Sequence, residues 1–249
     1  MKVFGKTDVG KRRANNQDQF VVDRDLQFFA IADGMGGHAA GEVASQIAIE
    51  TLVERIPANG RTESDETAPQ PETRLVEAIL EGNRRICESV TTHEERRGMG
   101  TTLVTFWHVA DNALIGHVGD SRAYRLREGQ LDRLTEDHSW VEEQVRRGVL
   151  SDEEAHNHPM RNVVTRAMGS AESPEVELNH AEVRPGDLYL LCSDGLNSMV
   201  SDEEIRQTLA RYADSPEEAC GGLIEQANAK GGDDNITVIV IGIEEQDIS

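Results

Sequence analysis

Apolar residues recur along the chain at two spacings, which predict a protein built from both strands and helices. Short segments that are apolar throughout, or that alternate with polar residues, are typical of strands. They lie at 19–22, 28–32, 101–109, 113–118, 123–127, 176–182, 188–192 and 236–243. Brief turns, such as 110–112, join several of them, and short connections favour antiparallel pairing. We therefore expect antiparallel sheets.

Three- and four-residue spacings of apolar side chains predict two long helices, at 41–55 and 72–90. Later helices are marked by their start signals. Ser151 and Ser201 are each followed three residues later by glutamate, as in a capping box, and Ser215 precedes Pro216. Strands and helices do not alternate regularly along the chain. This order favours antiparallel sheets covered by helices, an α+β fold.

The chain length and two polar segments predict the domain organisation. A length of 249 residues is typical of one domain with a full core. The polar segment 57–71, which holds three of the seven prolines, is interpreted as a surface loop between the two long helices. The charged, irregular segment 139–169 is expected to form a mobile excursion on the surface.

Composition excludes several classes of protein. Lysine and arginine total 25 and aspartate and glutamate 46, so the net charge of −21 argues against binding to nucleic acid or to an anionic membrane. No apolar run approaches the roughly 18 residues of a membrane helix, and the first residues lack the apolar stretch of a signal peptide. We expect a cytoplasmic protein with reduced, buried thiols at Cys87, Cys192 and Cys220.

Four aspartates occupy positions that surface acids rarely have. Asp33 and Asp194 follow apolar strands and are each followed by glycine, and Asp234 directly precedes the last strand. Asp18 closes the segment 13–18 just before another strand. Each could simply belong to a turn, and the acid excess could simply keep the surface solvated. Together, however, these strand ends predict a site for Mg²⁺ or Mn²⁺, which prefer carboxylate and carbonyl oxygens.

The segments around these aspartates resemble the metal-dependent protein phosphatases of type 2C, the PPM family, in their bacterial form. Matching segments run in family order from about residue 5 to residue 243: 13–18, 33–41, 98–102, 116–124, 134–139, 162–169, 192–196 and 232–237. The resemblance implies an α-β-β-α sandwich of two central antiparallel sheets flanked by helices. It also implies one catalytic domain over residues 1–245, with a flap at about 139–169 beside the cleft.

The resemblance further implies a centre of two Mg²⁺ or Mn²⁺ ions, with a possible third. Asp33 would bridge the two core ions, and Asp194 and Asp234 would complete the first site. The carbonyl of Gly34 would serve the second site, and Asp18 would bind metal-held water. Asp120 would hold a third, weaker ion, the alternative being a turn residue bonded to its own backbone. Asp234 is preferred over Asp233 because the family ligand directly precedes asparagine.

Two further residues are expected to act on the phosphate ester. Arg13 would clamp the phosphate, since a guanidinium matches phosphate oxygens in pairs; alternatively it is a surface residue of the basic run 11–13. His38, five residues after Asp33, would donate a proton to the leaving oxygen. His117 and His138 are interpreted as structural residues.

The resulting hypothesis is a serine/threonine protein phosphatase in which a metal-activated water hydrolyses phosphoserine or phosphothreonine. Its expected partners are phosphorylated proteins, among them a bacterial Ser/Thr kinase and its substrates. We expect a monomer that binds no nucleic acid and does not insert into membranes. The alternatives are a phosphatase of a small phosphorylated metabolite and a catalytically silent regulator that binds phosphoproteins.

Overall fold

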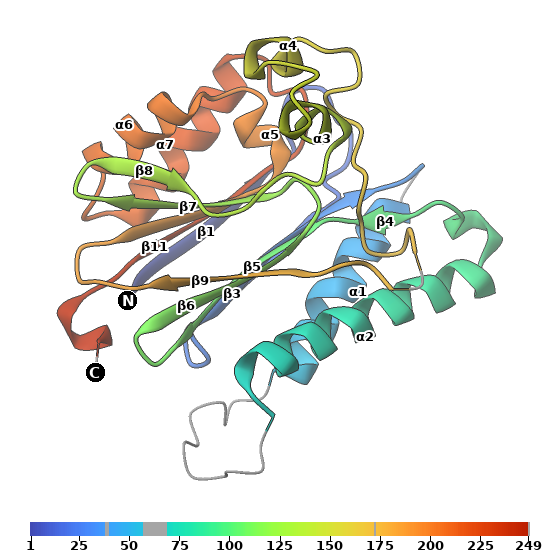
Figure 1. Cartoon of the computed structure of the whole chain (residues 1–249), viewed down its shortest axis with the longest axis horizontal. Helices are drawn as coiled ribbons and strands as arrows, with labels where there is room; N and C mark the ends of the chain where they lie inside the picture. Colours follow the sequence, from blue (N-terminus) through green and yellow to red (C-terminus); the bar gives the residue numbers. More distant parts are fainter. Residues whose placement is uncertain (38–39, 57–68, 172, 249) are drawn as a thin grey trace.

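Two antiparallel sheets stack face to face in the computed structural model, and helices cover their outer sides (Figure 1). The structure describes all residues except 38–39, 57–68, 172 and 249. The described strands are β1 (Lys2–Asp8), β2 (Asp18–Asp23), β3 (Phe28–Met35), β4 (Gly100–Thr101), β5 (Leu103–Val109), β6 (Asn112–Val118), β7 (Arg122–Arg127), β8 (Gln130–Arg133), β9 (Glu177–Glu182), β10 (Leu188–Cys192) and β11 (Ile236–Gly242). The described helices are α1 (Ala40–Arg55), α2 (Pro71–Thr92), α3 (Trp140–Arg146), α4 (Asp152–His156), α5 (Asp194–Asn197), α6 (Asp202–Arg211) and α7 (Pro216–Ala229), with short 3-10 helices η1 (Glu94–Arg96) and η2 (Glu245–Asp247).

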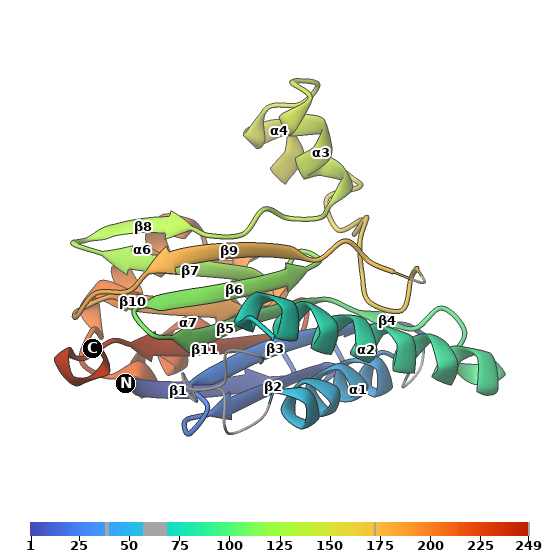
Figure 2. The same cartoon turned by 60° about the horizontal axis from the view of Figure 1, so that its bottom comes forward.

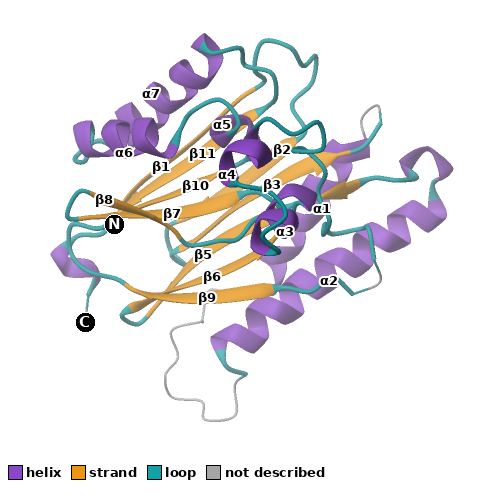
Figure 3. Ribbon diagram, turned by 45° about the horizontal axis from the view of Figure 1, so that its top comes forward, coloured by secondary structure: helices purple, strands orange, loops and turns teal. Residues whose placement is uncertain are grey.

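The first sheet has the order β1-β11-β10-β7-β8 and the second has the order β2-β3-β5-β6-β9, with β4 beside β3. Every ladder between these strands is antiparallel. Helices α1 and α2 cover the second sheet, and α6 and α7 cover the first (Figure 3). The expected α-β-β-α sandwich is therefore confirmed.

Three apolar clusters fill the spaces between the layers. One lies between the sheets and includes Phe29, Phe106 and Tyr189. The other two pack α1 and α2, and α6 and α7, against the outer faces of the sheets. Because β11 is covered on both faces, all seven of its residues are buried. The sandwich thus gives rigid strand ends on which functional groups can be held.

Several elements differ from the sequence prediction. Strands β1 and β8 were not predicted, because their sequences carry few apolar residues; in both, pairing with a longer neighbour stabilises the strand. Helix α1 buries its alanine face, whereas Val53 is 44% exposed. Residues 57–68 of the predicted loop lie outside the described residues, and Pro71 begins α2 instead of closing that loop.

No disulfide joins the three cysteines, all of which lie in the described part of the chain, and Cys87 is only partly buried, contrary to the prediction for it. Cys192 and Cys220 are buried as expected. No helix in the described part of the chain combines the length and the apolar character needed to cross a membrane.

The segment 139–169, called the flap below, projects from one end of the sandwich and carries α3 and α4 (Figure 2). Its two ends are joined by a bridge between Ser139 and Val164. Ser139 and Ser151 cap the two helices, and Ser151 forms the predicted capping box with Glu154. A second isolated bridge, between Met168 and Thr101, joins the returning end of the flap to β4.

Candidate metal centre

Asp18 and Asp33 face each other across the second sheet. Asp18 is the first residue of β2, and Asp33 is its direct partner on β3. The structure therefore extends β3 beyond the predicted strand end, so that Asp33 lies within the strand. Two aspartates in one cross-strand pair repel each other when both are charged. The register nevertheless places both carboxylates at the same end of the sandwich.

Asp194 and Asp234 come to the same point from the first sheet. Asp194 begins α5 directly after β10, and Asp234 lies just before β11. Two hydroxyl groups connect the sheets here, because the Asp18 Oδ2 atom accepts hydrogen bonds from Ser193 Oγ at 2.8 Å and Thr237 Oγ1 at 2.6 Å. The four aspartates predicted from the sequence are therefore brought together.

Asp120 follows β6 and lines a cleft of about 470 Å³ that it shares with Asp194. Flap residues Val141, Ala155 and Arg161 also line that cleft. Asp120 is 7% exposed, and its carboxylate lies near those of Asp33 and Asp194 while it also bonds its own backbone amide, as in the alternative interpretation of this residue. The flap therefore borders the side of the site where Asp120 lies.

Burial raises the pKa values of Asp18, Asp33, Asp120 and Asp194, since it disfavours the charged form. It raises the pKa of Asp18 to about 6 and that of Asp120 to about 6, with contributions from the neighbouring charges of Asp234 and Asp137. Burial, together with the charges of the surrounding aspartates, holds the pKa values of Asp33 and Asp194 well above 3.8.

The residues present fit a divalent metal centre. The Oδ1 atoms of Asp18 and Asp194 are buried and have no hydrogen-bond partner among the described residues. Nearby guanidinium groups are already engaged, since Arg122 binds Asp137 and Arg13 binds Asp234. Buried carboxylates with unused oxygens and raised pKa values are the donor set that hard cations favour.

Arg13 lies beside the cluster, where its Nη2 atom is 2.6 Å from the Asp234 Oδ2 atom. Its side chain is half exposed, so it can also contact a ligand in the cleft. The neighbouring Asp233 is exposed and pairs with Arg12 at 3.7 Å, which agrees with the choice of Asp234 over Asp233. His38, the predicted proton donor, lies outside the described residues.

Two glycines next to the aspartates serve close packing. A Cβ atom on Gly34 would lie 2.2 Å from the Gly41 carbonyl oxygen, and one on Gly195 would lie 2.0 Å from the Asn235 carbonyl oxygen. Glycine is therefore required at both positions. Gly195 brings α5 against the loop that carries Asp234.

Asn235 is a site residue for which the sequence predicted no role of its own. Its Oδ1 atom accepts the Gln17 N–H at 2.8 Å, and its Nδ2 atom donates to the carbonyls of Val9 and Asn15 at 3.0 and 2.9 Å. It therefore joins the loop that carries Arg13 to the strand end that carries Asp234. In the sequence, its only sign is the position of an asparagine between an acidic residue and an apolar strand.

Comparison with known proteins gives the same assignment as the geometry. The family model for protein phosphatase 2C matches residues 9–226. The chain is 40% identical to the serine/threonine protein phosphatase PstP of Mycobacterium tuberculosis, over 99% of this chain and 46% of that protein. It thus spans about half the length of that relative. It is also 40% identical to the serine/threonine phosphatase stp of Listeria innocua, over 95% of this chain and 93% of that one.

A solved structure resembles the whole sandwich. The catalytic domain of PstP, in complex with 2 manganese ions, superposes with a TM-score of 0.83 at 38% identity and covers 98% of each chain. The expected use of two divalent metal ions agrees with that complex. Taken with the match over residues 9–226 and the sandwich of antiparallel sheets, these similarities show that the chain belongs to the protein phosphatase 2C family.

Proposed function

We propose that the protein is a serine/threonine protein phosphatase that depends on Mg²⁺ or Mn²⁺. The observation that carries the proposal is the meeting of aspartates from both sheets at one end of the sandwich, with buried carboxylate oxygens that have no hydrogen-bond partner among the described residues. The names of the relatives support the same activity and phosphoprotein substrates.

The aspartates would hold the metal ions between the two sheets. Asp33 would contact both core ions, Asp194 and Asp234 would complete the first site, and Asp120 would serve a third ion. The Gly34 carbonyl and Asp18, which would bind metal-held water, complete the proposed set. When bound, such a pair of divalent cations lowers the pKa of water and neutralises charge that develops on the phosphate.

Arg13 would bind and orient the phosphate. In the structure its guanidinium is paired with Asp234, at the edge of the aspartate cluster. With Asp234 engaged as a metal ligand, the guanidinium could present a pair of its N–H groups to phosphate oxygens. The proton for the leaving oxygen is assigned to His38, as predicted from the sequence.

The flap suggests a protein substrate. Its cleft is polar, with Arg133, Arg161 and Asn162 beside Asp120, so it can receive residues that flank a phosphorylated side chain. We propose phosphoproteins as substrates, among them a bacterial Ser/Thr kinase and its targets, and a monomer as the working form. The cytoplasmic location and the domain bounds 1–245 stay predictions.

The proposal is tested by turnover of a phosphothreonine peptide with Mn²⁺, with excess EDTA, and in Asp33→Asn. We expect activity only in the wild type with Mn²⁺. Activity that persists in EDTA would contradict the metal centre, and faster turnover of sugar phosphates than of phosphopeptides would contradict the substrate class. Asp25→Asn, in the exposed turn between β2 and β3, is a matched control that should keep full activity.

A further inference from the structure

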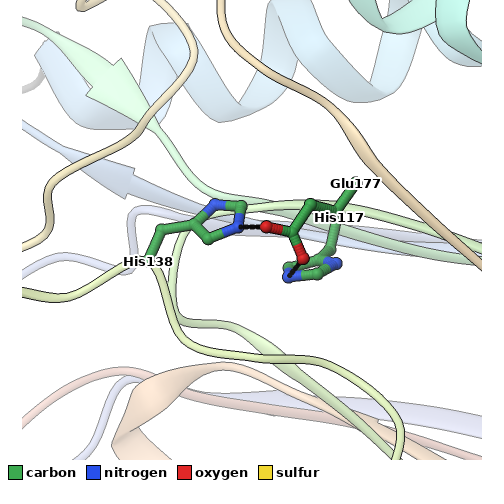
Figure 4. Close-up of side chains that lie close together, drawn as sticks. All are labelled: His117, His138 and Glu177. Atoms are coloured by element: carbon green, nitrogen blue, oxygen red, sulfur yellow. Dashed lines mark hydrogen bonds and ion pairs between the residues drawn. The ribbon is translucent and has the colours of Figure 1, made fainter. Parts of the chain in front are cut away.

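Two histidines and a glutamate lie together where the flap joins the sandwich (Figure 4). The rings of His117 and His138 stack with centroids 4.7 Å apart. Glu177, on β9, accepts a hydrogen bond from His138 Nε2 at 2.9 Å, and Arg166 Nη1 lies 3.2 Å from the same oxygen. None of these groups was assigned to the metal centre.

The hydrogen bonds of His117 and His138 indicate that the ring nitrogens facing Glu177 are protonated, so that this cluster does not bind a metal ion. The Gly119 amide can only donate, so His138 Nδ1 accepts its proton at 3.0 Å and Nε2 carries the ring proton. The Glu136 carbonyl can only accept, so His117 Nε2 is protonated as well, at 2.9 Å. The nitrogens that face Glu177 thus have no lone pair for a metal, and Arg166 adds a positive charge.

His138 is attached to Gly119 through two hydrogen bonds. Its backbone N–H donates to the Gly119 carbonyl at 2.9 Å, and its Nδ1 atom accepts the Gly119 N–H. Gly119 has a φ of +112° and packs against Thr102, since an added Cβ would lie 2.6 Å from the Thr102 Cβ. Thr102 in turn accepts the Asp33 N–H at 3.2 Å through Oγ1. The peptide just before Asp120 is thereby fixed to the strand that carries Asp33.

This attachment bears on Asp120, because the Asp120 carboxylate accepts a hydrogen bond from its own backbone amide. The backbone at 119–120 therefore helps to set the direction of that carboxylate. The carbonyl of His138 also accepts the Thr165 N–H at 2.8 Å, from the returning end of the flap. One residue thus contacts both the peptide that carries Asp120 and the closing end of the flap.

We propose that His138 is a positioning residue, which holds the Gly119 amide through Nδ1 and so directs the Asp120 carboxylate into the metal centre beside the flap. The inference rests on the proposed function in one respect, namely that Asp120 binds a metal ion. It extends that function, because it makes the occupancy of the Asp120 site depend on the base of the flap.

Two substitutions test the roles of the two His138 ring nitrogens separately. His138→Asn places an amide oxygen near the position of Nδ1 and keeps an acceptor for Gly119, but it cannot reach Glu177. His138→Gln reaches toward Glu177 but leaves the Gly119 amide without its acceptor. His180→Gln, an exposed histidine on the same strand as Glu177, is the matched control.

The readouts are amide hydrogen exchange at Gly119 in the metal-free protein, Mn²⁺ titration by calorimetry, and kcat and KM on a phosphopeptide. In His138→Gln we expect at least about tenfold faster exchange at Gly119, and about a 10- to 100-fold loss in Mn²⁺ affinity at the weakest site or in kcat. His138→Asn should retain most of the Mn²⁺ affinity and most of the kcat, although the two variants lose similar thermal stability. His180→Gln should match the wild type.

Equal losses of Mn²⁺ affinity and kcat in both variants, with unchanged amide exchange at Gly119, would mean that His138 only stabilises the fold. That result would overturn the proposal. If His138→Gln does not fold, nitrogen NMR of the wild type decides, because a proton on His138 Nδ1 would also overturn it. A wild type that binds no Mn²⁺ would instead refute the proposed function, and Gly119 exchange would still report on the His138 contact by itself.

Discussion

Asp18 is the direct cross-strand partner of Asp33, so two carboxylates occupy one rung of the β2–β3 ladder. Neutral or complementary pairs stabilise such rungs, and like charges destabilise them. The pair therefore lowers stability in the metal-free protein. A pair of aspartates at this position is explained if it forms a site that binds divalent cations at the expense of stability.

Metal removal should therefore destabilise the protein. At a free Mn²⁺ concentration 100 times the Kd, binding stabilises the fold by about 2.7 kcal/mol. We expect Tm, measured by calorimetry, to rise with Mn²⁺ and to return on addition of EDTA. Asp33→Asn should raise the Tm of the metal-free protein and abolish the Mn²⁺ response; a lower metal-free Tm would contradict the repulsion.

The raised pKa of Asp18 predicts a dependence of stability on pH. Burial raises this pKa from 3.8 to about 6, so between these values the folded chain keeps a proton that the unfolded chain has lost. Stability of the metal-free protein therefore falls as pH rises through this window, and the penalty is complete above about pH 6.

Asp18→Asn isolates this effect, because the amide oxygen can still accept the bonds of Ser193 and Thr237. In EDTA, the stability of the variant relative to the wild type should increase by on the order of 2 kcal/mol between about pH 4 and pH 7. Urea unfolding at each pH measures the difference. A constant difference would show that the Asp18 pKa is not raised.

The apolar patterns predicted antiparallel sheets covered by helices, and the family resemblance implied their arrangement as a sandwich. Segments 188–192 and 236–243 were located almost to the residue, and the serine caps at 151, 201 and 215 were found. Strands β1 and β8 escaped because their sequences are mostly polar, and their pairing partners lie far away or across a tight turn. Local patterns do not encode such partners.

The candidate site was predictable in its acids but not in their supports. Asp33, Asp194 and Asp234 lie next to apolar strands and glycines in the sequence, so their positions could be recognised without the structure. Asn235 and His138 act on residues far away in the chain, such as Gln17 and Gly119. The partners of a polar side chain are fixed only by the fold, so their roles could not be found from the sequence.

The neighbouring acids Asp233 and Asp234 provide a test of the ligand set. Asp234 lies against Arg13 and contributes to the raised pKa values of Asp18 and Asp33, whereas Asp233 is exposed and contacts Arg12. Asp234→Asn should lower kcat/KM on a phosphopeptide by about 100-fold or more, on the scale of groups that hold a catalytic metal. Asp233→Asn should change it less than threefold. Similar losses in both variants would argue against Asp234 as the ligand.

Asn235 is predicted to hold the Arg13 loop in place. Asn235→Ala removes one acceptor and two donated bonds and leaves buried backbone groups unpaired, which costs about 2 kcal/mol or more. Activity should fall as well, mainly through a higher KM, because Arg13 loses its fixed position. Asn179→Ala is the control, since that asparagine is exposed and donates to one carbonyl; chemical unfolding should show a change within about 0.5–1 kcal/mol. An equal loss in both variants would contradict the role of Asn235.

Gly195 should tolerate no side chain, whereas Gly221 should accept one. In Gly195→Ala the new Cβ would lie 2.0 Å from the Asn235 carbonyl oxygen, so α5 must shift and carry Asp194 with it. We expect a loss of stability of about 1–3 kcal/mol and weaker Mn²⁺ binding. Gly221 lies inside α7, where an added Cβ meets nothing within 4 Å, so Gly221→Ala should stabilise the helix by about 0.5–1 kcal/mol. Calorimetry with and without Mn²⁺ measures both, and normal Mn²⁺ binding by Gly195→Ala would show that Asp194 does not depend on this contact.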